Sequence, residues 1–305
     1  MMPFLYYCNV IIQFIYMQRR NFIKTLAIGA AGLSASSSLW ARSASPRALG
    51  LQLYTVRDAV AKDLPGTLER LAKLGYTRLE IYGYDGKFFG RDTAEFKKIL
   101  SGSGMQVISS HHLAGHGMKA KGTLLDGWDK AVEDLHALGA KYMACAYLFP
   151  EERTGEFYAK LPDLLNKSAE RTKAAGIQFA YHNHDFEFEK YGDATLYEHL
   201  LEKTDPQLMK MELDLYWIVK AGQDPISWFQ KYPGRFPLWH VKDMEKGSGD
   251  ITEVGNGAID FDRIFAARQQ AGLQEWFVEQ DESKGDIFNS IAQSHQFLDK
   301  KNYGR

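Results

Sequence analysis

Four residues with metal-ligating side chains each end a short apolar run: His182, Asp214, His240 and Glu279. The runs read QFAYH, KMELD, PLWH and WFVE, and the four residues are 32, 26 and 39 positions apart. This spacing is close to the length of one strand–helix unit in a (β/α)8 barrel, whose parallel strands end around one mouth. We therefore expect the four side chains to converge. Two imidazoles and two carboxylates suit Mn²⁺, Co²⁺, Zn²⁺ or Mg²⁺.

The elements that would position these residues are strand-like and helix-like segments, which alternate with little interruption after about residue 47. Amphipathic stretches such as LPGTLERLAKLG and WDKAVEDLHALG place apolar residues at helical spacing and end in glycine, which tolerates the left-handed backbone that terminates a helix. Between such stretches lie eight apolar segments that we expect to be strands: 49–54, 77–83, 105–111, 141–147, 177–182, 208–214, 236–241 and 275–280.

Eight strand–helix units within residues 47–305 predict an α/β fold, a single-domain (β/α)8 TIM barrel. A doubly wound open sheet is the competing architecture, and it would carry a glycine-rich nucleotide-binding loop after its first strand. The segment TVRD (55–58) stands at that place instead, which favours the barrel.

The composition is that of a globular protein with a large core, since 45% of the residues are hydrophobic and 13% are aromatic. The formal net charge is −1, so the chain lacks the basic excess with which nucleic-acid-binding proteins contact phosphates. We therefore expect no nucleic-acid partner.

The N-terminal segment resembles a twin-arginine export signal, in which paired arginines, a phenylalanine and often a lysine precede a weakly hydrophobic region. The stretch QRRNFIK (18–24) supplies these residues, and an Ala/Gly/Ser-rich stretch follows. We expect residues 17–46 to be a signal peptide and the mature protein to reach the periplasm without stable membrane insertion. Residues 1–16 are interpreted as an extension from an upstream start codon, because they are too few for a membrane anchor.

Further polar residues lie at the expected strand ends: Glu80, His111, His112, His184, Glu212 and Lys242. Because side chains alternate along a strand, His184 shares a face with His182, and Lys242 shares a face with His240. A lone histidine on a strand is most often a core or rim residue. Four candidate ligands on four successive strands instead favour a metal site.

The chain resembles the sugar phosphate isomerase/epimerase family, which consists of xylose-isomerase-like TIM barrels. The resemblance covers about residues 47–300. It is carried by the segments YHNHDFEF (181–188), MELDLYWIVKAG (211–222), HVKDM (240–244), VGNGAIDF (254–261) and FVEQD (277–281). The family includes ketose epimerases, hydroxypyruvate isomerase and inosose dehydratase.

The resemblance implies a divalent metal ion, and Asp214, His240 and Glu279 match three of the family's ligand positions. The fourth position departs from the pattern, because His182 stands where the epimerases have a glutamate. The His-x-His strand end resembles inosose dehydratase, which removes water next to a ketone. This difference puts a simple epimerisation in doubt and shifts weight toward elimination on a keto-sugar.

The mechanism implied by the resemblance begins with loss of a proton next to a carbonyl that the metal polarises, and a metal-stabilised enediolate forms. The candidate acids and bases are Glu279, His184 and His112. Lys242 would hold substrate oxygens or the developing negative charge. The other candidate substrate-binding residues are Glu80, Tyr216 and Trp217.

The leading hypothesis is a periplasmic, divalent-metal-dependent sugar isomerase/epimerase with a small-molecule sugar or keto-sugar substrate. A first alternative keeps the site but ends in elimination, as in a metal-dependent lyase or dehydratase acting on a keto-sugar or 3-keto-glycoside. A second alternative is a non-catalytic periplasmic sugar-binding barrel, which would need no acid/base residues. The oligomeric state is left open.

Overall fold

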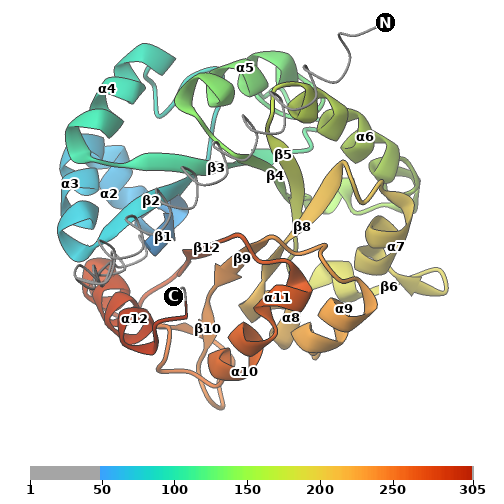
Figure 1. Ribbon diagram of the computed structural model, residues 1–305. Coiled ribbons are helices and arrows are strands. Elements are labelled where there is room, and N and C mark those ends of the chain that lie inside the picture. The colour runs from blue at the N-terminus through green and yellow to red at the C-terminus, as the bar shows by residue number, and fades with distance from the viewer. Residues whose placement is uncertain (1–48, 304–305) are drawn as a thin grey trace, which may run out of the picture. The chain divides into compact units, whose positions relative to one another are not determined.

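The computed structural model describes residues 49–303, which form a closed barrel of eight parallel strands surrounded by helices (Figure 1). The order of strands around the barrel is β1-β12-β9-β8-β5-β4-β3-β2. The predicted single-domain (β/α)8 TIM barrel is therefore confirmed. The strands are β1 Leu49–Gln52, β2 Tyr76–Ile81, β3 Gln106–Leu113, β4 Tyr142–Tyr147, β5 Gln178–His182, β8 Met209–Asp214, β9 Leu238–Val241 and β12 Glu275–Val278.

The helices form an outer layer around the barrel (Figure 1). They are α2 Arg57–Lys62, α3 Leu64–Leu74, α4 Thr93–Ser103, α5 Trp128–Leu138, α6 Gly155–Ala174, α7 Leu196–Lys203, α8 Leu215–Lys220, α9 Pro225–Lys231, α10 Phe261–Ala266, α11 Arg268–Ala271 and α12 Ile287–Lys301. Short 3-10 helices are η1 Leu53–Val56, η2 Pro150–Glu152 and η3 Phe186–Phe188. Two antiparallel pairs add β6 Lys190–Tyr191 to β7 Ala194–Thr195, and β10 Asp243–Met244 to β11 Ile251–Thr252.

Local sequence explains where several of these helices begin and end. Asp63 and Asp92 accept hydrogen bonds from backbone N–H groups in the first turns of α3 and α4, which leaves fewer unpaired donors there. Gly75 and Gly139 end α3 and α5 with φ angles of 96° and 82°, as the glycine pattern predicted. Among residues 49–303, no helix combines the length and apolar character needed to span a membrane.

The first strand is shorter than expected, and the difference matters for the site. The strand β1 ends at Gln52, whose side-chain oxygen accepts a hydrogen bond from the backbone N–H of Tyr54 at 3.1 Å. This bond starts the turn of η1, so Tyr54 does not continue the strand. Its side chain is 41% exposed.

An apolar layer fills part of the barrel interior, and its residues come from five strands: Ile108, Ala144, Ala180, Leu238 and Phe277. His182, His240 and Glu279 each follow a member of this layer by two positions. Because side chains alternate along a strand, these polar residues are stacked directly on the apolar layer.

A bulge in β3 decides which of its two histidines faces the interior. The register between β2 and β3 shifts by one residue at Ile108, so the alternation of faces changes there. His111 is paired with Ala144 of the interior layer and points into the barrel. His112 points to the helix layer, where its ring packs edge-on against Trp128 of α5 with a centroid distance of 5.2 Å.

The predicted start-site extension (1–16) and signal peptide (17–46) lie outside the described residues.

Candidate active site

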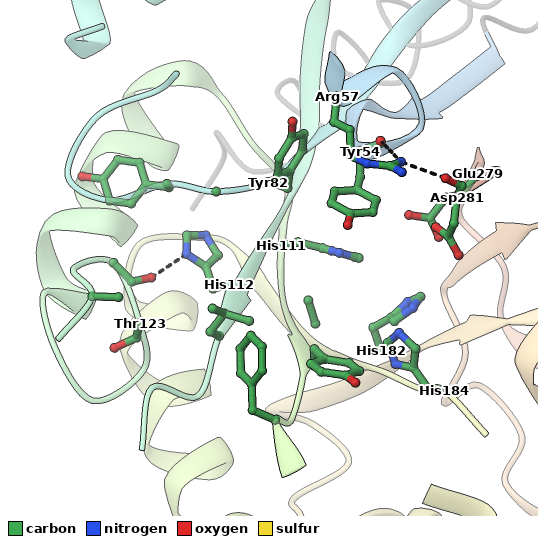
Figure 2. A pocket seen from close by; sticks show the side chains of 18 of the residues that line it. Tyr54, Arg57, Tyr82, His111, His112, Thr123, His182, His184, Glu279 and Asp281 are labelled. Carbon is green, nitrogen blue, oxygen red and sulfur yellow. Dashed lines mark hydrogen bonds between the residues drawn. The ribbon is translucent and has the colours of Figure 1, made fainter. Parts of the chain in front are cut away.

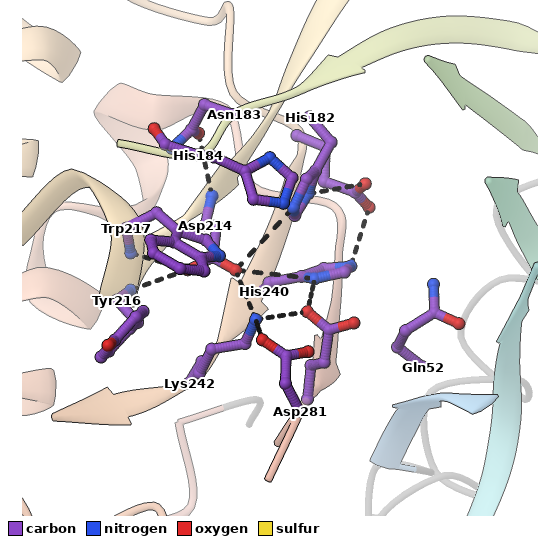
Figure 3. Close-up of polar contacts among 12 residues, drawn as sticks. Gln52, His182, Asn183, His184, Asp214, Tyr216, Trp217, His240, Lys242 and Asp281 are labelled. Carbon is purple, nitrogen blue, oxygen red and sulfur yellow. Dashed lines mark hydrogen bonds and ion pairs between the residues drawn. The ribbon is translucent and has the colours of Figure 1, made fainter. Parts of the chain in front are cut away.

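The four residues predicted as metal ligands lie together at the ends of β5, β8, β9 and β12 (Figure 3). We call His182, Asp214, His240 and Glu279 the donor group. One ligand atom from each lies within 4.8 Å of the others, and all four side chains are buried. His240 Nδ1 lies 2.8 Å from a Glu279 oxygen, and Asp214 Oδ2 lies 3.9 Å from both His182 Nε2 and His240 Nδ1. The strand-end pattern thus produces the expected convergence.

Asp214 is fixed by its place at the start of α8. Its Oδ1 accepts hydrogen bonds from the backbone N–H groups of Tyr216 and Trp217, at 2.8 and 3.0 Å. Its own N–H donates to the Asn183 side chain. Asp214 Oδ2 is buried, accepts no hydrogen bond and lies 3.2 Å from Lys242 Nζ. Burial raises the pKa of Asp214 to about 6, and the positive charge of Lys242 opposes this rise.

Lys242 supplies a buried positive charge beside the donor group. Its Nζ lies 2.7 Å from a Glu279 oxygen and 2.9 Å from an Asp281 oxygen (Figure 3). Burial alone would lower the pKa of Lys242, but Asp214, Asp281 and Glu279 raise it well above its usual range. Burial likewise favours the neutral form of Glu279, yet Lys242 and His240 lower its pKa overall. The lysine is therefore a stable ammonium group and Glu279 a carboxylate.

A second set of acidic groups lies on the far side of the two donor imidazoles. His182 Nδ1 lies 3.3 Å from a Glu212 oxygen, and His240 Nε2 lies 2.5 Å from a Glu80 oxygen. His111 bridges the two carboxylates, at 2.6 Å from Glu212 and 3.0 Å from Glu80. Each donor imidazole thus has one ring nitrogen toward the donor group and the other toward a carboxylate. This arrangement orients the histidine ligands of many metal sites.

The His111 imidazole supplies a positive charge between the carboxylates of Glu80 and Glu212. Burial opposes a charge on His111, but Glu80 and Glu212 raise its pKa to about 10. Burial would also raise the pKa of Glu80, yet His111 and His240 hold it well below its ordinary value. Gln52 donates a further hydrogen bond to Glu80 at 2.8 Å. A protonated His111 therefore lies between two buried carboxylates.

The donor set fits one divalent cation. A second possible ligand group, formed by His111 and Glu212 with His182 and His240, shares both imidazoles with the donor group. A neutral imidazole has one acceptor nitrogen, so two occupied groups would require both rings to lose their last proton. A protonated His111 already lies between Glu80 and Glu212 and cannot act as a ligand, so the donor group is the better site. Its nitrogen and oxygen ligands are compatible with zinc, manganese, cobalt or magnesium.

His184 lies next to the donor group on the segment that follows β5. Its ring centroid is 5.0 Å from that of His182 and 5.3 Å from that of Trp217. Its backbone N–H donates to Glu187 at 2.7 Å, and the same carboxyl group accepts a hydrogen bond from the Tyr181 hydroxyl at 2.9 Å. Burial and the charge of Lys242 lower the pKa of His184 to about 3, so its ring is neutral.

A pocket of about 720 Å³ opens onto this cluster (Figure 2). We call the donor group together with Lys242 the floor of the pocket, and of these residues His182, Glu279 and Lys242 line it. Residues from η1, from the segment after β2 and from the end of β4 with the turn after it form what we call the aromatic wall: Tyr54, Tyr82, Tyr147 and Phe149. In Figure 2, Tyr54 and Tyr82 lie on the side of His111 away from His182 and His184. Tyr147 packs edge-on against His184 with ring centroids 4.8 Å apart, so the aromatic wall also borders the charged residues of the pocket.

Three predicted site residues lie away from the floor, and two of them do not line the pocket. His112 borders the pocket, but its Nδ1 is paired with the Gly122 carbonyl at 2.8 Å and burial lowers its pKa to about 4. Glu80 lies one layer deeper, where it contacts imidazoles instead of the pocket. The Tyr216 ring is buried, and its hydroxyl donates to the Gly249 carbonyl at 3.0 Å. Trp217 lines the pocket, as expected.

Sequence reasoning assigned no role to several residues that border the site. His111 and Asp281 are polar residues near expected strand ends, so the pattern that found the donor group also contains them. The aromatic wall has no comparable signal. Tyr54, Tyr82 and Tyr147 fell within expected strands, and Phe149 lies in a turn without a recognisable motif.

A closed parallel barrel with acid, base and metal-ligating groups at the strand ends defines an enzyme of the TIM-barrel class. The sequence profile of the xylose isomerase-like TIM barrel family matches residues 68–301. The chain belongs to this family.

Several named proteins are similar over most of their length. The inosose dehydratase of Lacticaseibacillus casei is 24% identical over 268 residues, which cover 76% of this chain and 87% of that protein. The inosose dehydratase of Geobacillus thermodenitrificans is 26% identical, with 76% and 87% covered. A sugar phosphate isomerase/epimerase structure from Parabacteroides distasonis has a TM-score of 0.74 and 29% identity, with 86% of this chain and 96% of that chain covered.

A more distant neighbour is a structure of the IolI protein with a bound zinc atom, with a TM-score of 0.64 and 17% identity. It covers 84% of this chain and 96% of that chain. At this identity the likeness concerns the fold. Together the comparisons establish an enzyme family with both dehydratase and epimerase neighbours.

Proposed function

We propose that this chain is a divalent-metal-dependent lyase that acts on a keto-sugar. The observation that carries this proposal is the asymmetry of the floor. One side offers the carboxylate of Glu279 with the ammonium group of Lys242 beside it. The other side offers the imidazoles of His182 and His184, where the resemblance to the epimerases would require a second carboxylate. A carboxylate base opposite imidazoles suits removal of a proton followed by loss of an oxygen substituent.

The donor group would hold the cation, which when bound polarises a carbonyl and stabilises negative charge on its oxygen. Glu279 takes the proton from the carbon next to the substrate carbonyl. Lys242 donates to a substrate oxygen that gains negative charge. His184, as a neutral imidazole, donates a hydrogen bond from its one N–H to the leaving oxygen, and the proton that Glu279 has taken up passes to that oxygen as it leaves.

The elimination balances without another reactant. The electrons of the broken C–H bond form a carbon–carbon double bond, and the neighbouring C–O bond breaks. The oxygen takes up one proton and leaves as water or as an alcohol. The other product is an enone, so no oxidant or reductant is consumed.

The comparisons support a lyase reaction, because two of the relatives described above are named inosose dehydratases. The pocket supports a small polyhydroxylated substrate, since polar groups on its floor can fix hydroxyl oxygens and the wall can pack on the ring.

Incubation of the Mn²⁺-loaded protein with keto-sugars and 3-keto-glycosides in D₂O tests the proposal. We expect an enone absorbance together with a released water or alcohol, at a rate that depends on added metal. Deuterium exchange with recovery of the unchanged carbon skeleton would contradict elimination. Absence of both enone formation and exchange with every member of the panel would contradict proton abstraction.

An isomerase or epimerase is the second candidate. It is favoured by the Parabacteroides distasonis structure, which shares 29% identity and is named a sugar phosphate isomerase/epimerase. In the same experiment it would form the epimer or the aldose–ketose isomer with one deuterium and no enone. A non-catalytic sugar-binding barrel would bind these compounds without exchange.

We further propose that the protein is exported to the periplasm by the twin-arginine route, as QRRNFIK (18–24) suggests. Replacement of Arg19 and Arg20 by lysine tests this proposal in cells. We expect the wild type in the periplasmic fraction and the double variant in the cytoplasm with its leader retained. Equal distribution of the two proteins would contradict it.

A further inference from the structure

The aromatic wall has no role in the proposed chemistry, although it forms a large part of the pocket. We infer that it is a subsite for a second ring, so that the substrate is a keto-glycoside and the leaving group is its ring-bearing alcohol. This inference rests on the proposed lyase function and goes beyond it by naming the substrate class and the residues that select it.

The size of the pocket is the first support. A volume of about 720 Å³ lies well within the range of about 300–1,000 Å³ that accommodates drug-sized ligands. A monosaccharide bound at the floor would leave room in the pocket beside Tyr54 and Tyr82.

The chemistry of the wall is the second support. Tyr54 and Tyr82 pack edge-to-face with ring centroids 5.2 Å apart, and Tyr147 and Phe149 do so at 5.3 Å. Tyr54 is 41% exposed, which is unusual for a large aromatic side chain in this protein. Aromatic rings offer flat apolar area, and tyrosine adds a hydroxyl at its edge. Such a surface matches the apolar face and hydroxyl rim of a sugar ring, or the face of an aryl group.

The wall is also held rigid by two arginines. The Arg57 guanidinium stacks over the Tyr54 ring at 4.5 Å and donates to the Asp281 carbonyl oxygen at 2.8 Å. Arg153 donates to the Tyr147 hydroxyl at 2.5 Å and stacks over the Phe186 ring at 3.6 Å. A wall that is preorganised loses little side-chain entropy when a ring binds.

The geometry also joins the wall to the floor. Arg57 packs on a wall residue and donates to the backbone of Asp281, whose carboxylate accepts from Lys242. A ring that packs against Tyr54 therefore lies next to the ion pair of Asp281 and Lys242. The bond from a sugar at the floor to its aglycone oxygen would cross this boundary, which is where the C–O bond must break.

Binding of unreactive glycosides tests the inference without reliance on catalysis. Isothermal titration calorimetry would compare methyl glucoside with 4-nitrophenyl glucoside and with cellobiose, in both anomeric forms where available. We expect at least one of the two-ring ligands to bind about ten-fold or more tightly than the methyl glycoside, because stacking on the wall adds roughly 1.5 kcal/mol. Tighter binding of 4-nitrophenyl glucoside would identify the second ring as an aryl group, and tighter binding of cellobiose would identify it as a sugar.

The matched variants are Tyr54→Ala in the wall and Tyr191→Ala in a similar edge-to-face pair with Tyr158, at 5.4 Å, that does not line this pocket. The ratio of the affinity for the two-ring ligand to the affinity for the methyl glycoside should fall toward one in Tyr54→Ala. The same ratio should stay unchanged in Tyr191→Ala. Equal affinity for all ligands in the wild type, no measurable binding, or a preference that survives Tyr54→Ala would overturn the inference. Failure of the lyase proposal itself would appear separately, as absence of enone formation.

Discussion

The floor and the aromatic wall of the pocket are built from different parts of the barrel. The floor comes from the ends of β5, β8, β9 and β12, and its side chains are buried and mostly charged or imidazole-bearing. The wall comes from η1, from the segment after β2 and from the end of β4 with the turn after it, and its side chains are half-buried or exposed. The ends of β5, β8, β9 and β12 therefore carry the chemistry, and the chain around β1, β2 and β4 carries the surface that would select a substrate.

This difference follows from the cost of burying charge. A buried carboxylate or ammonium group is stable only when fixed partners surround it, and adjacent strands provide such partners at constant spacing. The aromatic side chains of the wall need no such network, so they can be replaced without disturbing the residues of the floor. The following experiments test whether the two regions act separately.

The largest effect is expected at the floor. Replacement of Glu279 by glutamine removes the proposed base and one metal ligand while keeping the size of the side chain. We expect the rate of deuterium exchange to fall about 10²- to 10⁴-fold, because general bases contribute this much. The exposed Glu156, which pairs with Lys160, provides the matched control Glu156→Gln. Equal rates in the two variants would contradict the assigned role of Glu279.

The deeper carboxylates should act on the metal and not on the substrate. In Glu212→Gln the side chain keeps its shape but loses the charge opposite His182 and His111. We expect Mn²⁺ affinity to fall about 10- to 100-fold, as for other outer-layer partners of histidine ligands. Competition with a fluorescent chelator measures this affinity. An unchanged value would show that Glu212 does not position His182.

Glu187 should make stability depend on pH. Burial raises the pKa of Glu187 to about 8, whereas an unfolded chain would have the ordinary value near 4.5. Between these values the folded protein binds more protons than the unfolded one, so the free energy of unfolding falls as pH rises, by at most about 1.4 kcal/mol per pH unit. Urea denaturation from pH 5 to 8 should show this contribution in the wild type and lack it in Glu187→Gln. If the free energy of unfolding changed with pH in the same way in both proteins, the raised pKa of Glu187 would be contradicted.

The smallest effect is expected at Tyr216, which lies next to the floor in sequence but outside the pocket. Tyr216→Phe removes the hydrogen bond to the Gly249 carbonyl, which should lower the free energy of unfolding by about 1 kcal/mol. Substrate affinity and exchange rate should stay at wild-type values. A change in the Michaelis constant would place Tyr216 in contact with substrate.

Much of the fold and the donor group could be predicted from the sequence because both follow from one pattern. Apolar runs that end in His182, Asp214, His240 or Glu279 encode buried strands and the polar residues that follow the apolar layer. Regular spacing then implies that these strand ends meet. Each step depends on local sequence and a repeating geometry.

The remaining features depend on contacts that the pattern does not contain. His112 was predicted as an acid or base, but the bulge at Ile108 exchanges its orientation with that of His111. Tyr216 follows Asp214 by two positions, but α8 begins there and turns its ring into the core. Tyr54 reaches the pocket because Gln52 bends the chain into η1. A bulge, a helix start and a turn thus each redirected a side chain.

The most direct test of the central claim is a Mn²⁺ titration of chelator-treated protein by calorimetry. The donor group predicts one Mn²⁺ per chain, since both imidazoles belong to a single site. Asp214→Asn keeps the hydrogen bonds that start α8 and removes one charged ligand, so its affinity should fall at least about 100-fold while Glu156→Gln binds as the wild type does. No binding by the wild type, two ions per chain, or equal affinity in Asp214→Asn would contradict the account.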